Sequence, residues 1–254
     1  MTAKPSNDGA QRLVLGLVGI GLFLAAWQLI GIYKLAGLTW PPLSVVVAFL
    51  IDPSKTTLFV RAASATFTSV AIGYVSGTVA GIAFAMLGHV VTGLKPGLDR
   101  LIAVIHAIPL IALAPLFMVM MSRDSTSAAI SGLGVFYMIY VATTSGLTAS
   151  SATHRDVFRA LGATAVTRFW RLDLPAALPA VVSGMKLAVP VAFIGGIVGE
   201  WFGASRGLGL LMVSAMQNFQ IPLLWSAVLI MTVTSLVLFG LMSLLERLTC
   251  GRYQ

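Results

Sequence analysis

The sequence predicts an all-α polytopic membrane protein with six transmembrane helices. Of its 254 residues 58% are hydrophobic and only 9% are charged, and the mean hydropathy is +0.96. A soluble domain of this length needs far more charge to cover its surface. Apolar stretches of about 20 residues, the length that crosses a bilayer, recur along the chain between short polar segments.

The first apolar stretch carries no charge and is not followed by a small-residue cleavage site, so we expect a retained span rather than a signal peptide. Proline or charge interrupts the third and fifth stretches, which indicates that they face protein rather than lipid. The six expected spans are Leu13–Ile32, Ala62–Leu87, Leu101–Met121, Ala128–Leu147, Pro179–Phe202 and Leu223–Leu245.

Lysine and arginine in the loops predict the orientation, because cytoplasmic loops are enriched in both. With six spans the two termini share a side, and that side holds ten basic residues against five on the other. We therefore expect a cytoplasmic tail of residues 1–12 and a single transmembrane domain of residues 13–254, with the loop 149–175 also cytoplasmic. The ten are Lys4, Arg12, Lys95, Arg100, Arg155, Arg159, Arg168, Arg171, Arg247 and Arg252; the five are Lys34, Lys55, Arg61, Arg123 and Arg206.

Two outer loops are predicted to hold short helices. Val45–Ile51 follows a turn that contains two prolines. Apolar residues between Leu208 and Phe219 recur at steps of three and one, which defines one face of a helix. We expect this second helix to lie on the bilayer surface, with a gate as the alternative.

Several function classes are disfavoured. The net charge of +8 is distributed between apolar runs, which indicates membrane orientation rather than nucleic-acid binding. No G-x-x-x-x-G-K-[ST] motif occurs, so the chain does not hydrolyse ATP by that route. Paired carboxylates, metal-ligand spacings and a Ser-His-Asp order are also missing. We expect no catalytic residue, no bound metal and no cofactor on this chain.

The loop 149–175 carries the strongest functional signal. Val157, Phe158 and Leu161 share one flank of a predicted amphipathic helix that ends at Gly162, a common helix stop. So much apolar surface in a cytoplasmic loop calls for a partner that covers it. Contact of this basic loop with lipid headgroups is the alternative.

The loop resembles the EAA loop of permeases from ABC importers of the binding-protein-dependent type. The shared pattern is G-x9-[IL]-x-L-P with an acidic residue six positions before the glycine. Ile108–Leu116 and Leu174–Gly209 are similar to the sulfonate, taurine and nitrate permease group, and the resemblance extends from about Arg61 to the C-terminus. The matching loop positions are Asp156, Gly162, Leu172, Leu174 and Pro175.

The resemblance implies that Asp156–Gly162, with Arg159 at its centre, is a coupling helix that docks into a groove on an ATP-binding subunit. The family's usual Glu-Ala-Ala is replaced by Asp156-Val157-Phe158. The larger apolar side chains predict a partner groove shaped to receive them, and hence a dedicated ATPase.

The same resemblance implies the rest of the assembly. We expect two ATP-binding subunits that hold ATP and magnesium, a second permease subunit that is another copy of this chain, and an extracytoplasmic substrate-binding protein. The complex would lie in the lipid of a bacterial inner membrane and import a small solute, with a sulfonate-, taurine- or nitrate-like anion favoured. A vitamin precursor or another heterocycle is the alternative solute.

Ionisable groups and prolines in the spans are candidates for the pathway or a gate, because charge is costly in a membrane. We expect Glu200 to pair with Arg61 or Arg206, with a clamp or outer gate as the alternative. Lys186 is expected to extend to the cytoplasmic surface, or to contact the partner half or the pathway. His106 is expected to be a bonded core residue rather than a pathway residue, and Pro109 to bend the third span.

Two other classes of protein remain in view. An ion-coupled secondary transporter needs ionisable groups near the midplane, and His106 is the one candidate. A structural membrane scaffold needs neither the amphipathic loop nor the prolines of the third span. Neither class accounts for the spacing of the loop motif.

Overall fold

The computed structural model describes residues 8–250, and this part of the chain is helical with no strand. The first half contains α1 (Asp8–Ile32), α2 (Leu43–Leu50), η1 (Pro53–Lys55), α3 (Thr56–Val90), α4 (Lys95–Ala107) and α5 (Leu110–Met120). The second half contains α6 (Arg123–Thr148), α7 (Ala152–Ala160), α8 (Ala165–Arg168), η2 (Phe169–Asp173), α9 (Leu174–Trp201), α10 (Leu208–Gln217) and α11 (Ile221–Cys250).

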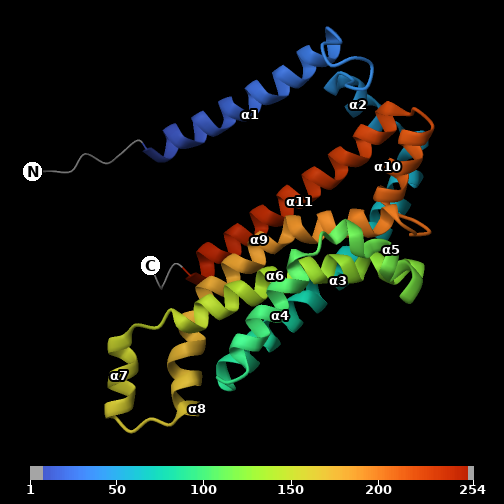
Figure 1. The fold of residues 1–254 in the computed structure, drawn as a ribbon. Coiled ribbons are helices and arrows are strands. Elements are labelled where there is room, and N and C mark those ends of the chain that lie inside the picture. Colours follow the sequence, from blue (N-terminus) through green and yellow to red (C-terminus); the bar gives the residue numbers. More distant parts are fainter. Residues whose placement is uncertain (1–7, 251–254) are drawn as a thin grey trace, which may run out of the picture.

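Helix α6 packs along both α3 and α9, and these three helices form the centre of the bundle (Figure 1). Glycines allow the close approach. A Cβ on Gly77 of α3 would lie 2.4 Å from the carbonyl oxygen of Gly132 on α6. A Cβ on Gly199 of α9 would lie 2.5 Å from Cα of Ser127 on α6. Small residues at such contacts let backbones pack tightly where lipid removes much of the hydrophobic driving force between helices.

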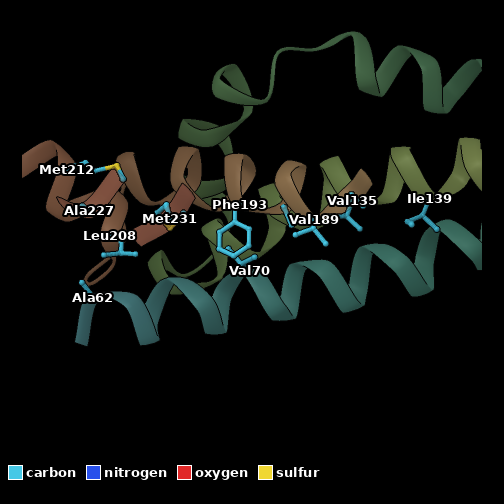
Figure 2. Packing of buried hydrophobic residues seen from close by; sticks show 12 residues of the cluster. Ala62, Val70, Val135, Ile139, Val189, Phe193, Leu208, Met212, Ala227 and Met231 are labelled. Atoms are coloured by element: carbon cyan, nitrogen blue, oxygen red, sulfur yellow. The ribbon is translucent and has the colours of Figure 1, made fainter. Parts of the chain in front are cut away.

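The main apolar core joins α3, α6, α9, α10 and α11. Figure 2 shows Phe193 of α9 next to Val70 of α3, with Val135 and Ile139 of α6 further along the same layer. The rings of Phe67 and Phe193 meet edge to face with their centroids 5.9 Å apart. This geometry is a favoured one for aromatic pairs and fixes α3 against α9.

The expected third span, Leu101–Met121, bends at Pro109 as predicted, but it is not one continuous helix. Its residues form α4 and α5, which are bent by 93° relative to each other. The break lies at Ile108 and Pro109, where the proline has no N–H to continue the first helix. Among residues 8–250, five helices are long and apolar enough to cross a membrane, and the number is six if this bent pair is one span.

Helix α1 stands apart from the other long helices and meets α2 near one end (Figure 1). A cluster of Trp27, Trp40 and Trp225 holds this end of α1 against α11, with ring centroids 4.7 to 5.7 Å apart. Trp27 Nε1 donates to the carbonyl oxygen of Pro41 at 3.1 Å, and Trp225 Nε1 donates to that of Thr39 at 2.9 Å. The cluster therefore anchors α1 by aromatic contact and by hydrogen bonds together.

The molecule has two distinct ends. The α7–α8 hairpin projects from one end, and α2 and α10 lie at the other (Figure 1). Helix α2 confirms the predicted short helix at Val45–Ile51. Helix α10 is also present, and part of the apolar face that we expected to lie on the bilayer is covered by protein. Leu208, Met212 and Ala215 are buried against α9 and α11, while Phe219 just beyond the helix is 85% exposed.

Candidate functional site

The first helix of the projecting hairpin has defined ends. Ser151 Oγ accepts from the N–H of His154 at 3.2 Å and caps the start of α7. At the other end Gly162 has a φ of +69°. Its N–H donates to Arg159 O at 3.0 Å, and the N–H of Ala163 donates to Phe158 O at 2.9 Å. These two bonds form a Schellman motif, so the predicted glycine stop is confirmed.

The α7 surface is uncovered. Asp156 and Arg159 form an exposed ion pair at 3.3 Å, which contributes little to stability because solvent screens it. Val157 is 50% and Leu161 78% exposed, while Phe158 is half-buried. Within the described chain, this hairpin leaves the apolar side chains of Val157 and Leu161 open, and such patches mark interaction sites.

The second half of the hairpin returns to the bundle. Helix α8 and the π-helical turn η2 lead directly into α9. Phe169 packs with Leu147 of α6 and Ala177 of α9, and Leu174 lies against this cluster. Leu172 and Pro175 are half-buried in the same region, which joins the hairpin to α9 and is called the root here. The motif residues thus separate into an exposed segment on α7 and a packed root at the start of α9.

Asp173 is a residue of this root that the sequence analysis did not select. It is 2% exposed, and it accepts hydrogen bonds from Ser150 Oγ at 3.1 Å and Arg168 Nε at 3.3 Å. Nε2 of His89, at the end of α3, lies 3.2 Å from the same carboxylate. Asp173 therefore ties three segments together beneath the hairpin. An acidic residue between the two leucines of the motif was the available sequence signal.

Glu200 forms a clamp near the opposite end of α9. It is 1% exposed, and its Oε2 accepts from the N–H of Gly209 in the first turn of α10 at 2.6 Å. Thr66 Oγ1 on α3 accepts from the N–H of Leu208 at 2.8 Å. The expected pairing of Glu200 with Arg61 or Arg206 is therefore wrong for the described structure. The carboxylate is turned toward backbone N–H groups that the start of a helix leaves free.

Lys186 does not extend to the surface as expected. Its Nζ lies 2.6 Å from Oε2 of Glu246 on α11 and 5.7 Å from the ring centroid of Phe239. Ser183 also donates to Glu246. The lysine therefore joins α9 to α11 within this chain, because a paired charge costs less in a membrane than an isolated one.

His106 and Pro109 lie at the bend between α4 and α5. The ring of His106 is stacked on Tyr137 of α6, with centroids 3.4 Å apart and an interplanar angle of 4°. His106 is exposed, so the expectation of a bonded core histidine is wrong. Lys186 and Glu200 are 14 residues apart on α9, about 21 Å along a helix. The four candidate pathway residues do not come together in one site.

Comparisons with known proteins agree with this architecture. The family model described as "Binding-protein-dependent transport system inner membrane component" matches residues 77–249. The chain is 32% identical over 208 residues to the formylaminopyrimidine transport permease protein ThiX of Halalkalibacterium halodurans, and 82% of each chain is covered. It is 21% identical over 248 residues to the taurine transport system permease protein TauC of Escherichia coli, covering 94% of this chain and 90% of TauC.

A solved structure shares the fold. One chain of the MetNI methionine ABC transporter in an inward facing conformation superimposes with a TM-score of 0.70 at 17% sequence identity. The match covers 78% of this chain and 99% of that one. At this identity the similarity concerns the arrangement of the helices.

Proposed function

Because the chain belongs to the family of binding-protein-dependent transport system inner membrane components, we propose that its hairpin couples ATP hydrolysis on a partner subunit to solute import. The chain is a multi-pass permease subunit of an ABC importer. The coupling role of Asp156–Gly162 is the new element of the proposal. It would make this segment the point where a soluble motor acts on the membrane helices.

The uncovered face of α7 is the observation that supports the proposal. Val157 and Leu161 are exposed on a helix whose two ends are fixed by a serine cap and a Schellman motif. A rigid helix presents its apolar side chains at low entropic cost, which favours insertion into a groove. The buried Asp173 at the root would pass the resulting movement to α3 and α9.

The proposal extends to the partners of the chain. Two ATP-binding subunits would hold ATP and magnesium, and each would receive one hairpin. A second copy of this chain would supply the other half of the pathway, and a substrate-binding protein would deliver solute at the α10 end. The hairpin, and both termini with it, would then be cytoplasmic. The ends of the described chain lie toward the hairpin end of the bundle, which agrees with that orientation (Figure 1).

The solute we propose is a small anion of the sulfonate, taurine or nitrate type. Relatives named for taurine and for nitrate transport support an anion. Relatives named for formylaminopyrimidine and for riboflavin transport favour the alternative, a heterocycle. An ion-coupled secondary transporter has less support, because His106 is exposed at the bend and stacks on a tyrosine.

Uptake into proteoliposomes tests the coupling role. The chain is reconstituted with its copurifying partners, and ATP-dependent uptake of taurine, nitrate and a pyrimidine is compared between the native protein and Gly162→Pro. Proline cannot adopt a φ of +69° and removes the N–H that bonds Arg159 O. We expect assembly to persist while uptake and ATPase stimulation are lost.

Gly162→Asn is the matched control, because asparagine tolerates the left-handed conformation. It should keep uptake. Native uptake by Gly162→Pro would overturn the coupling role of α7. Uptake that needs no ATPase would favour the secondary transporter instead.

A further inference from the structure

Two arginines meet at the end of the bundle opposite the hairpin. Arg61 of α3 and Arg206 of the α9–α10 connection line the same cavity, which has a volume of about 340 Å³. Hydroxyl groups line it as well, from Ser64, Thr68 and Ser69 on α3 and Ser127 on α6. Positive charge and polar groups are thus concentrated in one hollow at the outer end, where solute would enter.

The positive charge is not neutralised within the described residues. No acidic side chain appears among the lining residues of this cavity, and the described ion pairs involve neither arginine. Glu200 is near in sequence, but it is buried and bonded to Gly209. The guanidinium groups therefore remain available for a ligand.

Most hydroxyl groups of the cavity already donate a hydrogen bond to a backbone carbonyl oxygen. Ser64 Oγ donates to Arg61 O at 3.0 Å, and Thr68 Oγ1 donates to Ser64 O at 2.8 Å. Ser127 Oγ donates to Gly196 O at 2.9 Å. The arginines are then the main donors. Their planar, forked N–H groups fit the paired oxygens of a carboxylate, sulfonate or phosphate.

A second hollow adjoins the first. It has a volume of about 470 Å³ and shares Arg61 and Arg206, but its other lining includes Leu58, Leu210 and Leu211. The two arginines thus lie between a polar and an apolar hollow. A ligand with a charged head and a short hydrocarbon tail matches this arrangement, because the tail gains free energy when it leaves water.

We propose that Arg61 and Arg206 form a binding site on the permease itself for a small organic oxyanion. The polar cavity takes the oxygens and the Leu58–Leu210 side takes the carbon chain. The proposal rests on the import function above and specifies its solute class. A neutral heterocycle would leave both guanidinium groups without a partner, so the site discriminates between the two candidate solutes.

Chloride NMR tests the site without any transport. The permease purified in a neutral detergent is titrated with chloride, and the ³⁵Cl line width reports weak binding at cationic sites. Butanesulfonate is then added as a competitor. We expect native protein to broaden the line and butanesulfonate to reverse the broadening. The double variant Arg61→Gln, Arg206→Gln should bind butanesulfonate about tenfold more weakly.

Arg123→Gln is the matched control, because Arg123 is an exposed basic residue at the start of α6 that does not line either hollow. It should behave as the native protein.

Leu58→Ala tests the contact with the hydrocarbon tail. It should reduce the preference for butanesulfonate over methanesulfonate, which in a fully apolar site reaches about fourfold per methylene group.

Equal competition by butanesulfonate in the native protein and the double variant would overturn the proposal. The arginines would instead be shown to dock acidic residues of a binding protein if the double variant lost ATPase stimulation by that protein while its anion competition stayed native. Because line broadening needs neither ATP nor uptake, a failure of the import function leaves this result readable. Conversely, if the native protein imports solute but butanesulfonate does not reverse the line broadening, the binding-site proposal fails while the import function stands.

Discussion

The two ends of the molecule use glycine in opposite ways. Gly162, at the end of α7, has a φ of +69°, and a Cβ added there would meet nothing within 4 Å. Gly207, before α10, has a φ of +148°, and a Cβ added there would lie 2.3 Å from the carboxylate of Glu200. One glycine only allows a backbone turn, whereas the other also makes room for a buried side chain.

The difference separates a closed end from an open one. At the α10 end, the start of α10 is satisfied by Glu200 and Thr66, and Leu208 and Met212 of its apolar face are buried in the core. At the hairpin end, the caps of α7 are satisfied but Val157 and Leu161 remain uncovered. Backbone order without side-chain burial is what a preformed docking helix requires.

The root of the hairpin should be the most sensitive position. Asp173→Ala removes a buried carboxylate and leaves Arg168 without its acid partner. Asp173 accepts two hydrogen bonds, and bonds to charged groups are worth about 1.5–3 kcal/mol each, so we expect the unfolding free energy to fall by about 3 kcal/mol or more. Thermal unfolding in detergent measures the loss. Asp156→Ala on the exposed α7 is the control and should change stability by less than about 0.5 kcal/mol. Equal losses of stability in the two variants would contradict the claim that the root stabilises the fold and the exposed hairpin helix does not.

The Glu200 clamp should come next. Glu200→Ala leaves the N–H of Gly209 without its acceptor, and hydrogen bonds to charged groups are worth about 1.5–3 kcal/mol. Glu200→Gln keeps an acceptor oxygen of similar shape and should recover most of the loss. Protease resistance of the α9–α10 connection reports the local effect. If Glu200→Gln were as damaging as Glu200→Ala, charge rather than the hydrogen bond would hold the clamp.

A matched pair of glycine substitutions tests the comparison directly. Gly162→Ala should cost about 1–2 kcal/mol from the left-handed conformation alone. Gly162→Asn should be nearly neutral, since asparagine visits that conformation. At Gly207 the same asparagine would collide with Glu200, so Gly207→Asn should disrupt the α10 start. Circular dichroism melting of the four proteins, native included, gives the ranking, and a tolerated Gly207→Asn would contradict the closed packing.

The smallest effect on folding is expected on the open face. Val157→Ser with Leu161→Ser should leave the unfolding free energy within about 0.5 kcal/mol, because both side chains are exposed. The affinity of this double variant for the ATP-binding subunit should nevertheless fall about tenfold, as measured by titration of purified subunits.

Phe158→Ala replaces a large apolar side chain of α7 by the alanine that the family usually has at this position. Better coupling of this variant to an unrelated ATPase would support a dedicated native partner, and unchanged coupling would contradict it.

The sequence predicted the long helices because continuous apolar runs have one solution in a membrane. It predicted the end of α7 because a glycine that ends a helix needs only its own left-handed backbone conformation, which does not depend on distant contacts. It did not predict that Lys186 pairs with Glu246 or that Asp173 contacts His89, since each of these partners lies on a helix that only the folded bundle brings near. The contact of Glu200 with the N–H of Gly209 was missed because it depends on how the α9–α10 connection folds back. The sharp bend at Pro109 was under-predicted for a related reason: proline signals a kink, but its angle depends on the contacts of α4 and α5 with the bundle.

Solvent access to one highly exposed apolar position at each end of the molecule tests the contrast between the two ends most directly. Leu161→Cys and Phe219→Cys are placed separately in a Cys250→Ser chain, since Leu161 is 78% and Phe219 85% exposed. Labelling by a soluble maleimide is then measured with and without the ATP-binding subunit. We expect the subunit to slow labelling at position 161 about tenfold or more and to leave labelling at position 219 unchanged. Equal labelling at position 161 in both conditions would contradict this expectation.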